Sequence, residues 1–156
     1  MILSRACTYG IQAVVYTATQ NPNGYVSIAE AARELNIPFY FLTKVLQTLT
    51  DNKLLLSKRG ANGGIMLAKK AVDISLLDII SAIDGLSVFE ECILGLPGCG
   101  HASPCPIHHH WAGQREKLRA HFSKTTLADV AQNVRERVFR IASIDDVTKN
   151  VLKIEL

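Results

Sequence analysis

The sequence predicts a mainly α-helical fold with a small β-hairpin wing, in which a winged helix-turn-helix is followed by a long dimerisation helix. Apolar residues recur at helical spacing in three short segments before residue 52. Two apolar runs, at 54–57 and 65–67, flank a glycine-rich basic segment and predict a hairpin. A further amphipathic segment begins at Pro106 and is long enough for an extended helix.

The first two helices are delimited by capping and turn residues. Apolar residues repeat at helical spacing from Ile11 to Ala18, and the turn sequence at 21–24 ends this helix. Ser27 and Glu30, three positions apart, predict a capping box at the start of the second helix. The second helix is short, as is the first helix of a helix-turn-helix.

The third helix has two unlike faces, and Pro38 suits its start. The inner face is apolar: Leu42, Val45, Leu46 and Leu49. The outer face is polar with one cation: Tyr40, Thr43, Lys44 and Gln47. A short helix of this kind, following another across a tight turn, is typical of a recognition helix, so we expect the outer face to read DNA bases.

The predicted hairpin resembles a DNA-contacting wing. Its tip, residues 58–64, contains three glycines, which let a backbone approach a phosphate or a minor groove closely. Lys58 and Arg59 supply positive charge, and Asn62 adds a polar side chain. The alternative is an ordinary hairpin whose glycines only provide positive φ.

A cluster of soft metal ligands is the best clue to function. Cys92, Cys99, Cys105 and His108 lie in a segment broken by glycine and proline, with six, five and two residues between them. Thiolates and imidazole are ligands for zinc, copper(I) and iron–sulfur clusters. Because structural zinc sites usually contain a tighter C-x2-4-C pair, the wide spacing favours a cluster-sized site. The alternative is that some of these residues are unligated thiols of a loop.

Length and composition bound the remaining classes. The chain has 156 residues and 48% hydrophobic residues, enough for one globular domain with a core. The uncharged stretch 6–29 is interrupted by amides, proline and glycine, so we expect no membrane span. No signal peptide is apparent, so we expect a cytoplasmic, reducing compartment, where cysteines serve metals more often than disulfides. The net charge of +3 lies in residues 1–83, which weakly favours a polyanionic partner there.

Taken in order, these motifs resemble a known family. The helix-turn-helix, the wing sequence Arg59-Gly-Ala-Asn-Gly-Gly64, the segment 74–85 (ISLLDIISAIDG) and three spaced cysteines are similar to the IscR/NsrR/RirA family of winged-helix iron–sulfur regulators, over residues 1 to about 130. The resemblance implies a cytoplasmic homodimer that binds operator DNA and carries a 2Fe-2S or 4Fe-4S cluster. It implies that the three cysteines are cluster ligands, with His108 in the place of the fourth.

Two departures from the family pattern affect these expectations. Some members complete the cluster with an acidic residue of the partner's first helix, but the matching stretch here, residues 5–8, has no acid. Cys7 is a substitute candidate, although a cysteine there is more often a core residue, and His101, His109 and His110 are further candidates. In the recognition helix, Thr43 and Lys44 replace the Glu-Gln or similar pair of IscR-like members, so the operator sequence stays open.

The C-terminal half is expected to supply the dimer contact. The apolar stripe of the helix beginning near Pro106 is Ile107, Trp111, Leu118 and Phe122, with Gln114 in the gap. The alternative is that this stripe packs within its own chain. A last helix begins at Thr126, with Asp129 as a partial capping box.

The expected organisation has four segments: residues 1–85 form the DNA-binding domain, 86–108 the cysteine-rich segment, 106–144 the dimerisation and C-terminal helices, and 145–156 a tail.

The sequence thus predicts a homodimeric transcription regulator that senses iron, redox or nitric oxide status. An enzyme is not expected, because no oxyanion-type loop or acidic orienting residue accompanies the cysteines. A metal-carrier function would not explain the wing or the polar outer face of the third helix. A cluster-free regulator of the same fold, sensing zinc or thiol state, is the remaining alternative.

Overall fold

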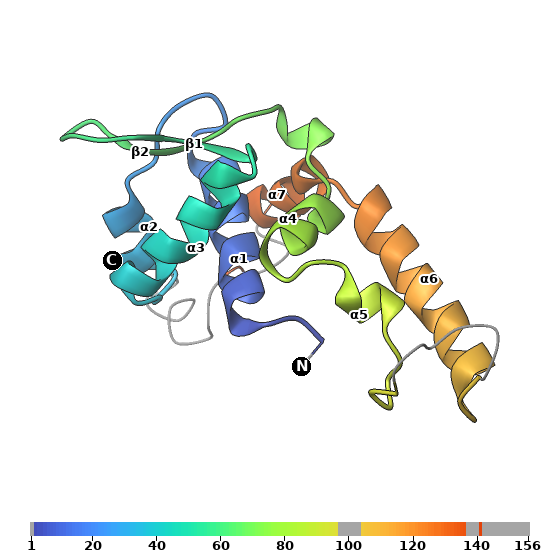
Figure 1. Cartoon of the computed structure of the whole chain (residues 1–156). Coiled ribbons are helices and arrows are strands. Elements are labelled where there is room, and N and C mark those ends of the chain that lie inside the picture. Colours follow the sequence, from blue (N-terminus) through green and yellow to red (C-terminus); the bar gives the residue numbers. More distant parts are fainter. Residues whose placement is uncertain (1, 97–103, 137–140, 142–156) are drawn as a thin grey trace, which may run out of the picture.

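The predicted fold class is confirmed by a computed structural model that describes residues 2–96, 104–136 and 141. The chain is mainly helical, with one two-stranded antiparallel hairpin among these residues (Figure 1). In order, the elements are α1 (Arg5–Gln20), α2 (Ile28–Glu34), α3 (Phe39–Asp51), β1 (Leu55–Lys58), β2 (Gly64–Leu67), the 3-10 turn η1 (Ala71–Asp73), α4 (Leu76–Ile83), α5 (Ser87–Glu90), α6 (His108–Lys124) and α7 (Leu127–Arg135). No helix in this part of the chain is long and apolar enough to cross a membrane.

One apolar core joins α1, α2, α3, the hairpin, α4 and α7, which together we call the body. Helix α1 is central and contacts α2, α3, α4 and α7. The four apolar residues predicted for the inner face of α3 are all buried in this core. Their burial fixes the rotation of α3, so its polar face points outward.

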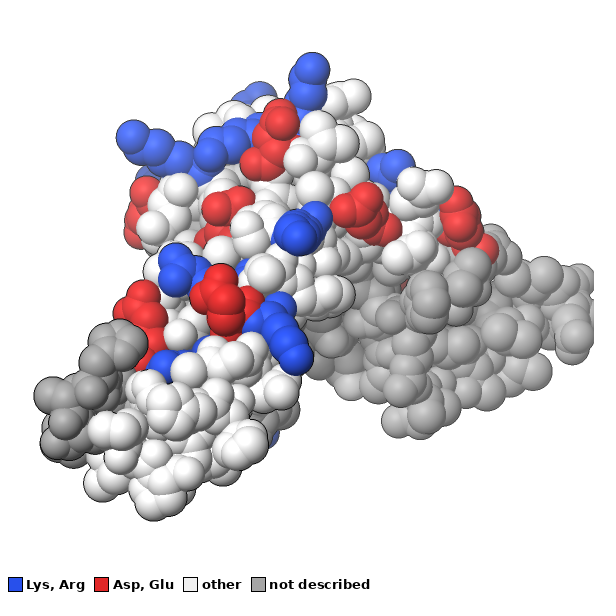
Figure 2. Space-filling model, turned by 90° about the vertical axis from the view of Figure 1, so that its right-hand side faces the viewer, with Lys and Arg blue, Asp and Glu red and all other residues white. Residues whose placement is uncertain are grey.

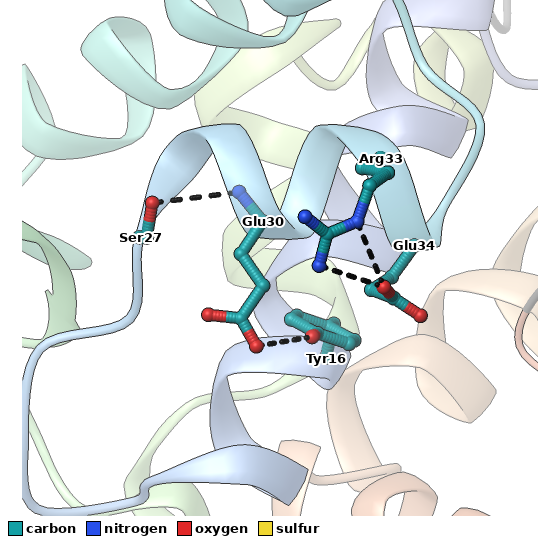
Figure 3. Close-up of polar contacts among 5 residues, drawn as sticks. All are labelled: Tyr16, Ser27, Glu30, Arg33 and Glu34. Atoms are coloured by element: carbon teal, nitrogen blue, oxygen red, sulfur yellow. Dashed lines mark hydrogen bonds and ion pairs between the residues drawn. The ribbon is translucent and has the colours of Figure 1, made fainter.

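Helix starts follow the predicted caps, with one difference. Ser27 accepts a hydrogen bond from the Glu30 N–H, as expected, at 3.4 Å (Figure 3). The Glu30 carboxylate instead accepts from the Tyr16 hydroxyl, at 3.4 Å, so the reciprocal half of the capping box is replaced by a contact between α2 and α1. The box at Thr126 and Asp129, expected to be partial, is complete.

The wing lies where the sequence predicted it, although β1 begins one residue later. Leu55 pairs with Leu67 and Lys58 with Gly64. Val26, just before α2, exchanges two backbone hydrogen bonds with Ile65, at 2.8 and 2.9 Å, and so ties the hairpin to the helix-turn-helix. Gly64 has a φ of 143°, and a Cβ there would collide with the Val26 carbonyl oxygen, so glycine is required.

The second part of the molecule, which we call the arm, comprises residues 87–124: α5, the ligand loop at 91–107, and α6. Helix α6 runs away from the body in Figure 1, and the wing lies at the opposite end of the molecule. Leu118 and Phe122 of α6 pack against a small buried cluster of Cys7, Ile80 and Phe89. These two members of the predicted stripe therefore pack within their own chain.

Helix α7 returns from the arm to the body. The Leu127 N–H donates to the Ile74 carbonyl at 2.7 Å, and the Leu127 side chain is fully buried in the body core. Arg135, in the last turn, donates to the Ala18 carbonyl of α1. The final described helix thus belongs to the same core as α1, while α6 connects this core to the ligand loop.

Candidate metal centre and DNA interface

Two of the four predicted metal ligands meet in the structure. Cys92 follows α5 and is buried, Cys105 precedes α6 and is half-buried, and their Sγ atoms lie 3.5 Å apart. Two thiolates bound to one tetrahedral metal at about 2.3 Å lie roughly 3.8 Å apart. The spacing of these two sulfurs, from the two ends of the ligand loop, therefore fits binding to a shared metal.

Of the other two predicted ligands, only His108 lies within the described residues. Cys99, like His101, lies outside the described residues. His108 is the first residue of α6; it is 8% exposed, and its N–H donates to the Cys105 carbonyl at 2.9 Å. Among the described residues, no three side chains of the metal-binding types form a group that could hold a metal ion. His109 and His110 are exposed on α6.

Two side chains of α6 hold the Cys92 end of the ligand loop. The Trp111 indole Nε1 donates to the Glu91 carbonyl at 3.0 Å. The Arg115 Nη1 donates to the carbonyls of Glu90 and Glu91, at 2.5 and 2.7 Å. The acceptors are the last two carbonyls before Cys92, so the loop end is fixed to the side of α6.

Sequence reasoning missed Arg115, and the gap in the apolar stripe was assigned to the wrong residue. Gln114 is exposed, whereas Arg115 is 9% exposed and faces inward. The residues facing the rest of the chain are 111, 115, 118 and 122, a regular helical spacing. Arg115 occupies the position in the helical repeat between Trp111 and Leu118, and this placement of a cation on an apolar face is the signal from which it could have been found.

Cys7 lies in α1, in an apolar cluster between body and arm. Its side chain is fully buried beside Ile80 and Phe89. Burial, together with a smaller contribution from the nearby Asp84 carboxylate, raises the pKa of the Cys7 thiol to about 12. The thiol is therefore protonated at neutral pH in this environment.

The candidate DNA-reading face of α3 is exposed, but two of its polar side chains make hydrogen bonds within α3 itself. Tyr40 is 83% exposed, and Lys44 is also exposed. The half-buried Thr43 hydroxyl donates to the Phe39 carbonyl at 2.8 Å, and the exposed Gln47 amide donates to the Asp51 carboxylate at 2.8 Å. Lys44 and the aromatic surface of Tyr40 thus offer the most accessible contacts.

The wing residues Lys58, Arg59 and Asn62 are all exposed. The Lys58 ammonium lies 5.8 Å from the centre of the Tyr25 ring, a cation–π distance that holds it at the base of the wing. Tyr25 was not among the predicted residues.

Charge is distributed unevenly between body and arm. Figure 2 looks onto the α6 side of the molecule, where blue and red residues are spread over the upper part and the lobe at lower left is mostly white. Residues 92–114 contain no Lys, Arg, Asp or Glu. Among the described residues of this segment, four large apolar side chains are 41–56% exposed: Ile93, Leu94, Leu96 and Ile107.

Known proteins match this architecture over most of the chain. The model of the Rrf2 family, described as iron-dependent transcriptional regulators, matches residues 3–133. A protein of Aquifex aeolicus, described as an HTH-type transcriptional regulator, is 30% identical over 144 residues, which cover 91% of this chain and 99% of that protein.

Two solved structures are similar at 25% identity. CymR, the global cysteine regulator of B. subtilis, superimposes with a TM-score of 0.70 and covers 83% of this chain and 95% of its own. IscR of T. potens gives a TM-score of 0.69, covering 88% of this chain and 91% of its own. The resemblance inferred from sequence is confirmed, and the family and these neighbours are regulators rather than enzymes. By its fold and by the extent of these matches, the chain belongs to the Rrf2 family of transcriptional regulators.

Proposed function

We propose that this chain acts in the cytoplasm as a homodimeric DNA-binding regulator, whose ligand loop holds an iron–sulfur cluster that reports iron, redox or nitric oxide status. The observation that carries the proposal is the 3.5 Å approach of the Cys92 and Cys105 sulfurs in a winged-helix regulator. Two soft ligands that converge from opposite ends of a loop are difficult to explain by packing alone.

The donor set is suited to such a cluster. Cys92, Cys99 and Cys105 would supply thiolates, and His108, one turn after Cys105, is the candidate fourth ligand. A 2Fe-2S or 4Fe-4S cluster would supply a centre whose presence or oxidation state depends on iron, oxidants or nitric oxide. The chain's own contribution is to hold the loop ends close together and to keep charged side chains out of segment 92–114.

The structure offers a direct mechanical route from the loop to DNA. Arg115 and Trp111 fix the loop to α6, and α6 leads into α7, which lies against α1 in the body core. Helix α1 in turn contacts the recognition helix α3. A change in loop conformation would therefore move α6 relative to the body, and with it the spacing of the two recognition helices in a dimer.

The DNA contacts are assigned by element. Tyr40, Thr43, Lys44 and Gln47 would face base edges in a major groove, while Lys58, Arg59 and Asn62 would contact phosphates or the adjacent minor groove. In a two-fold dimer the recognition helices enter successive major grooves, so the operator should be an imperfect palindrome with half-sites about 34 Å apart.

A second candidate is a cluster-free regulator of the same fold that senses thiol state or zinc. The same pair of sulfurs favours it, because a two-electron oxidant such as a low-molecular-weight disulfide could oxidise both thiols to a disulfide while the sulfurs move only from 3.5 Å to about 2.05 Å. The structural similarity to a cysteine regulator, CymR, is a second reason to consider it.

Anaerobic reconstitution separates the two candidates. The cluster proposal expects brown protein with visible iron–sulfur absorbance and stoichiometric iron and sulfide. Removal of the cluster should then change operator affinity by about 5- to 150-fold, the usual range of allosteric coupling. His108→Ala should leave a labile or spectroscopically altered cluster. Equal operator affinity with and without the cluster would contradict a sensor role, and colourless protein that binds zinc alone would favour the second candidate.

A further inference from the structure

Arg115 is the most unusual side chain of the arm. It lies in the middle of α6 with only 9% of its surface exposed, although arginine is seldom buried without an ion-pair partner. Among the described residues, no carboxylate lies within ion-pair distance of its guanidinium. Its Nε is buried and, within the same residues, has no hydrogen-bond acceptor. Because burying a charged guanidinium costs free energy, Arg115 is expected to have a structural or functional role beyond keeping the surface soluble.

Within the described part of the chain, Arg115 donates its hydrogen bonds to the backbone that leads into Cys92. Its Nη1 donates to the Glu90 and Glu91 carbonyls, while both glutamate side chains are exposed. Because the Glu91 carbonyl and the Cys92 N–H belong to one planar peptide unit, holding that oxygen restricts where the Cys92 side chain can lie. The Trp111 indole binds the same carbonyl from one turn earlier on α6.

The other end of the loop is fixed to the same helix. Cys105 is held to the first turn of α6 by the hydrogen bond from the His108 N–H to its carbonyl. Arg115 lies seven residues after His108, which is about 10 Å along a helix at about 1.5 Å per residue. Helix α6 thus holds Cys105 at its first turn and, through hydrogen bonds from two of its side chains, also holds the backbone before Cys92.

We propose that Arg115 is a positioning residue that brings Cys92 to Cys105, so that these two ligands are already close together before a metal is bound. This inference rests on the proposed function, since it assigns a cause to the geometry of that site. Arginine suits the task better than lysine, because its planar guanidinium holds a fixed orientation while it donates to two carbonyls. Without these hydrogen bonds, the conformational entropy of the ligand loop would favour a larger separation between Cys92 and Cys105.

The closeness of the two sulfurs can be measured without any metal. In apo protein carrying Cys99→Ser, the Cys92 and Cys105 thiols react with oxidised glutathione to give one intramolecular disulfide and two molecules of reduced glutathione. The equilibrium constant of this exchange gives the effective concentration of one thiol at the other. A positioning residue raises this value, whereas a residue that only adds global stability leaves it unchanged.

We expect Arg115→Met to lower the effective concentration about 10- to 100-fold, as for lost hydrogen bonds to a charged donor. Arg115→Lys, which keeps the charge but not the planar fork, should give a smaller decrease. Arg119→Gln is the matched control, because Arg119 is an exposed arginine one turn further along α6, and it should behave as wild type. Helix content and thermal unfolding of each variant report whether α6 remains folded.

Two outcomes would overturn the inference. The first is that folded Arg115→Met protein has the same effective concentration of the two thiols as wild type. If Arg115→Met loses α6, the same result in Arg115→Lys would overturn the inference. The second is an equal decrease in Arg119→Gln. Failure of the wild type to take up iron would contradict the proposed function but leave this assay valid. If iron is taken up, an altered visible spectrum in Arg115→Lys, but not in Arg119→Gln, gives an independent readout.

Discussion

The body and the arm are held together by different forces. In the body, one apolar core connects α1 to α4, the hairpin and α7, and its largest side chains are fully buried. In the arm, the end of the ligand loop is held by hydrogen bonds from Trp111 and Arg115 to backbone carbonyls, and several large apolar residues are exposed. Hydrophobic burial thus determines the body and the attachment of α6 to it, whereas a few polar contacts and the proposed ligand determine the ligand loop.

This difference indicates how a regulator can respond to a ligand without unfolding. A segment held by few buried contacts changes conformation at low cost, while a well-packed core transmits movement as a unit. The two regions meet where Cys7 and Ile80 of the body form one apolar cluster with Phe89 and side chains of α6. The comparison therefore predicts that changes in the ligand loop alter ligand binding and leave stability intact, and that changes in the body core do the reverse.

The largest expected effect concerns the cysteines. Replacing Cys92, Cys99 or Cys105 individually with Ala should abolish cluster binding, because water is a poor substitute for a thiolate ligand. Iron and sulfide per protomer after anaerobic reconstitution measure the loss. The thermal unfolding midpoint of the apo variants should stay near that of wild type, as the ligand loop lies outside the body core. Full iron in any one variant would remove that cysteine from the ligand set.

A pair of leucines tests the contrast in packing. Leu127→Ala should destabilise the protein by about 2–5 kcal/mol, because Leu127 is fully buried in the body core. Leu94→Ala, in the arm, should change the free energy of unfolding by no more than about 0.5 kcal/mol, since Leu94 is 56% exposed. Urea unfolding of apo protein measures both. Similar losses in the two variants would contradict the division into body and arm.

Much of the body could be predicted because its signals are local. The apolar face of α3, the glycine-rich wing and the caps at Ser27 and Thr126 each depend on residues a few positions apart. The missed details depend on tertiary contacts. Glu30 binds Tyr16 of another helix instead of completing its capping box, and no local pattern indicates that choice.

The site was less predictable for the same reason. Spacing alone indicated a cysteine cluster, but the approach of Cys92 to Cys105 depends on an arginine 23 residues beyond Cys92. The apolar stripe of α6 is correct for Leu118 and Phe122, which pack on the small buried cluster, whereas Ile107 is exposed and the gap is filled by Arg115 instead of Gln114. A buried arginine is improbable from composition, so the pattern of apolar residues alone does not indicate it. The short helix α5 gave no periodic signal at all.

An intermediate effect is expected at the exposed tip of the wing, whose residues 58–62 lie outside the core. Arg59→Ala should weaken binding to all DNA sequences alike and lower the slope of log affinity against log salt by about one unit, as for one lost phosphate contact. Lys124→Ala removes an exposed cation at the far end of α6 and is the control for net charge. An unchanged salt slope in Arg59→Ala would mean that the hairpin does not contact DNA.

The smallest expected effect concerns Cys7, at the junction of body and arm. Because burial raises its pKa from 9.0 to about 12, the folded state disfavours the thiolate relative to the unfolded chain. The stability that the neutral thiol contributes is fully present below about pH 9 and is lost as the pH rises from about 9 towards 12, at no more than about 1.4 kcal/mol per pH unit. Urea unfolding at pH 7.5, 9 and 10 should therefore show a steeper decline in wild type than in Cys7→Ala.

Tyr16, whose pKa burial also raises to about 12, contributes equally to both proteins, so only the difference between the two slopes is diagnostic. The methyl side chain of Cys7→Ala changes stability by an amount that does not depend on pH, so it shifts the whole curve without changing its slope. Parallel curves for the two proteins would mean that the Cys7 thiol ionises as readily in the folded as in the unfolded chain. Cys7 would then be accessible enough to serve as a ligand, and the junction between body and arm would be looser than its packing indicates.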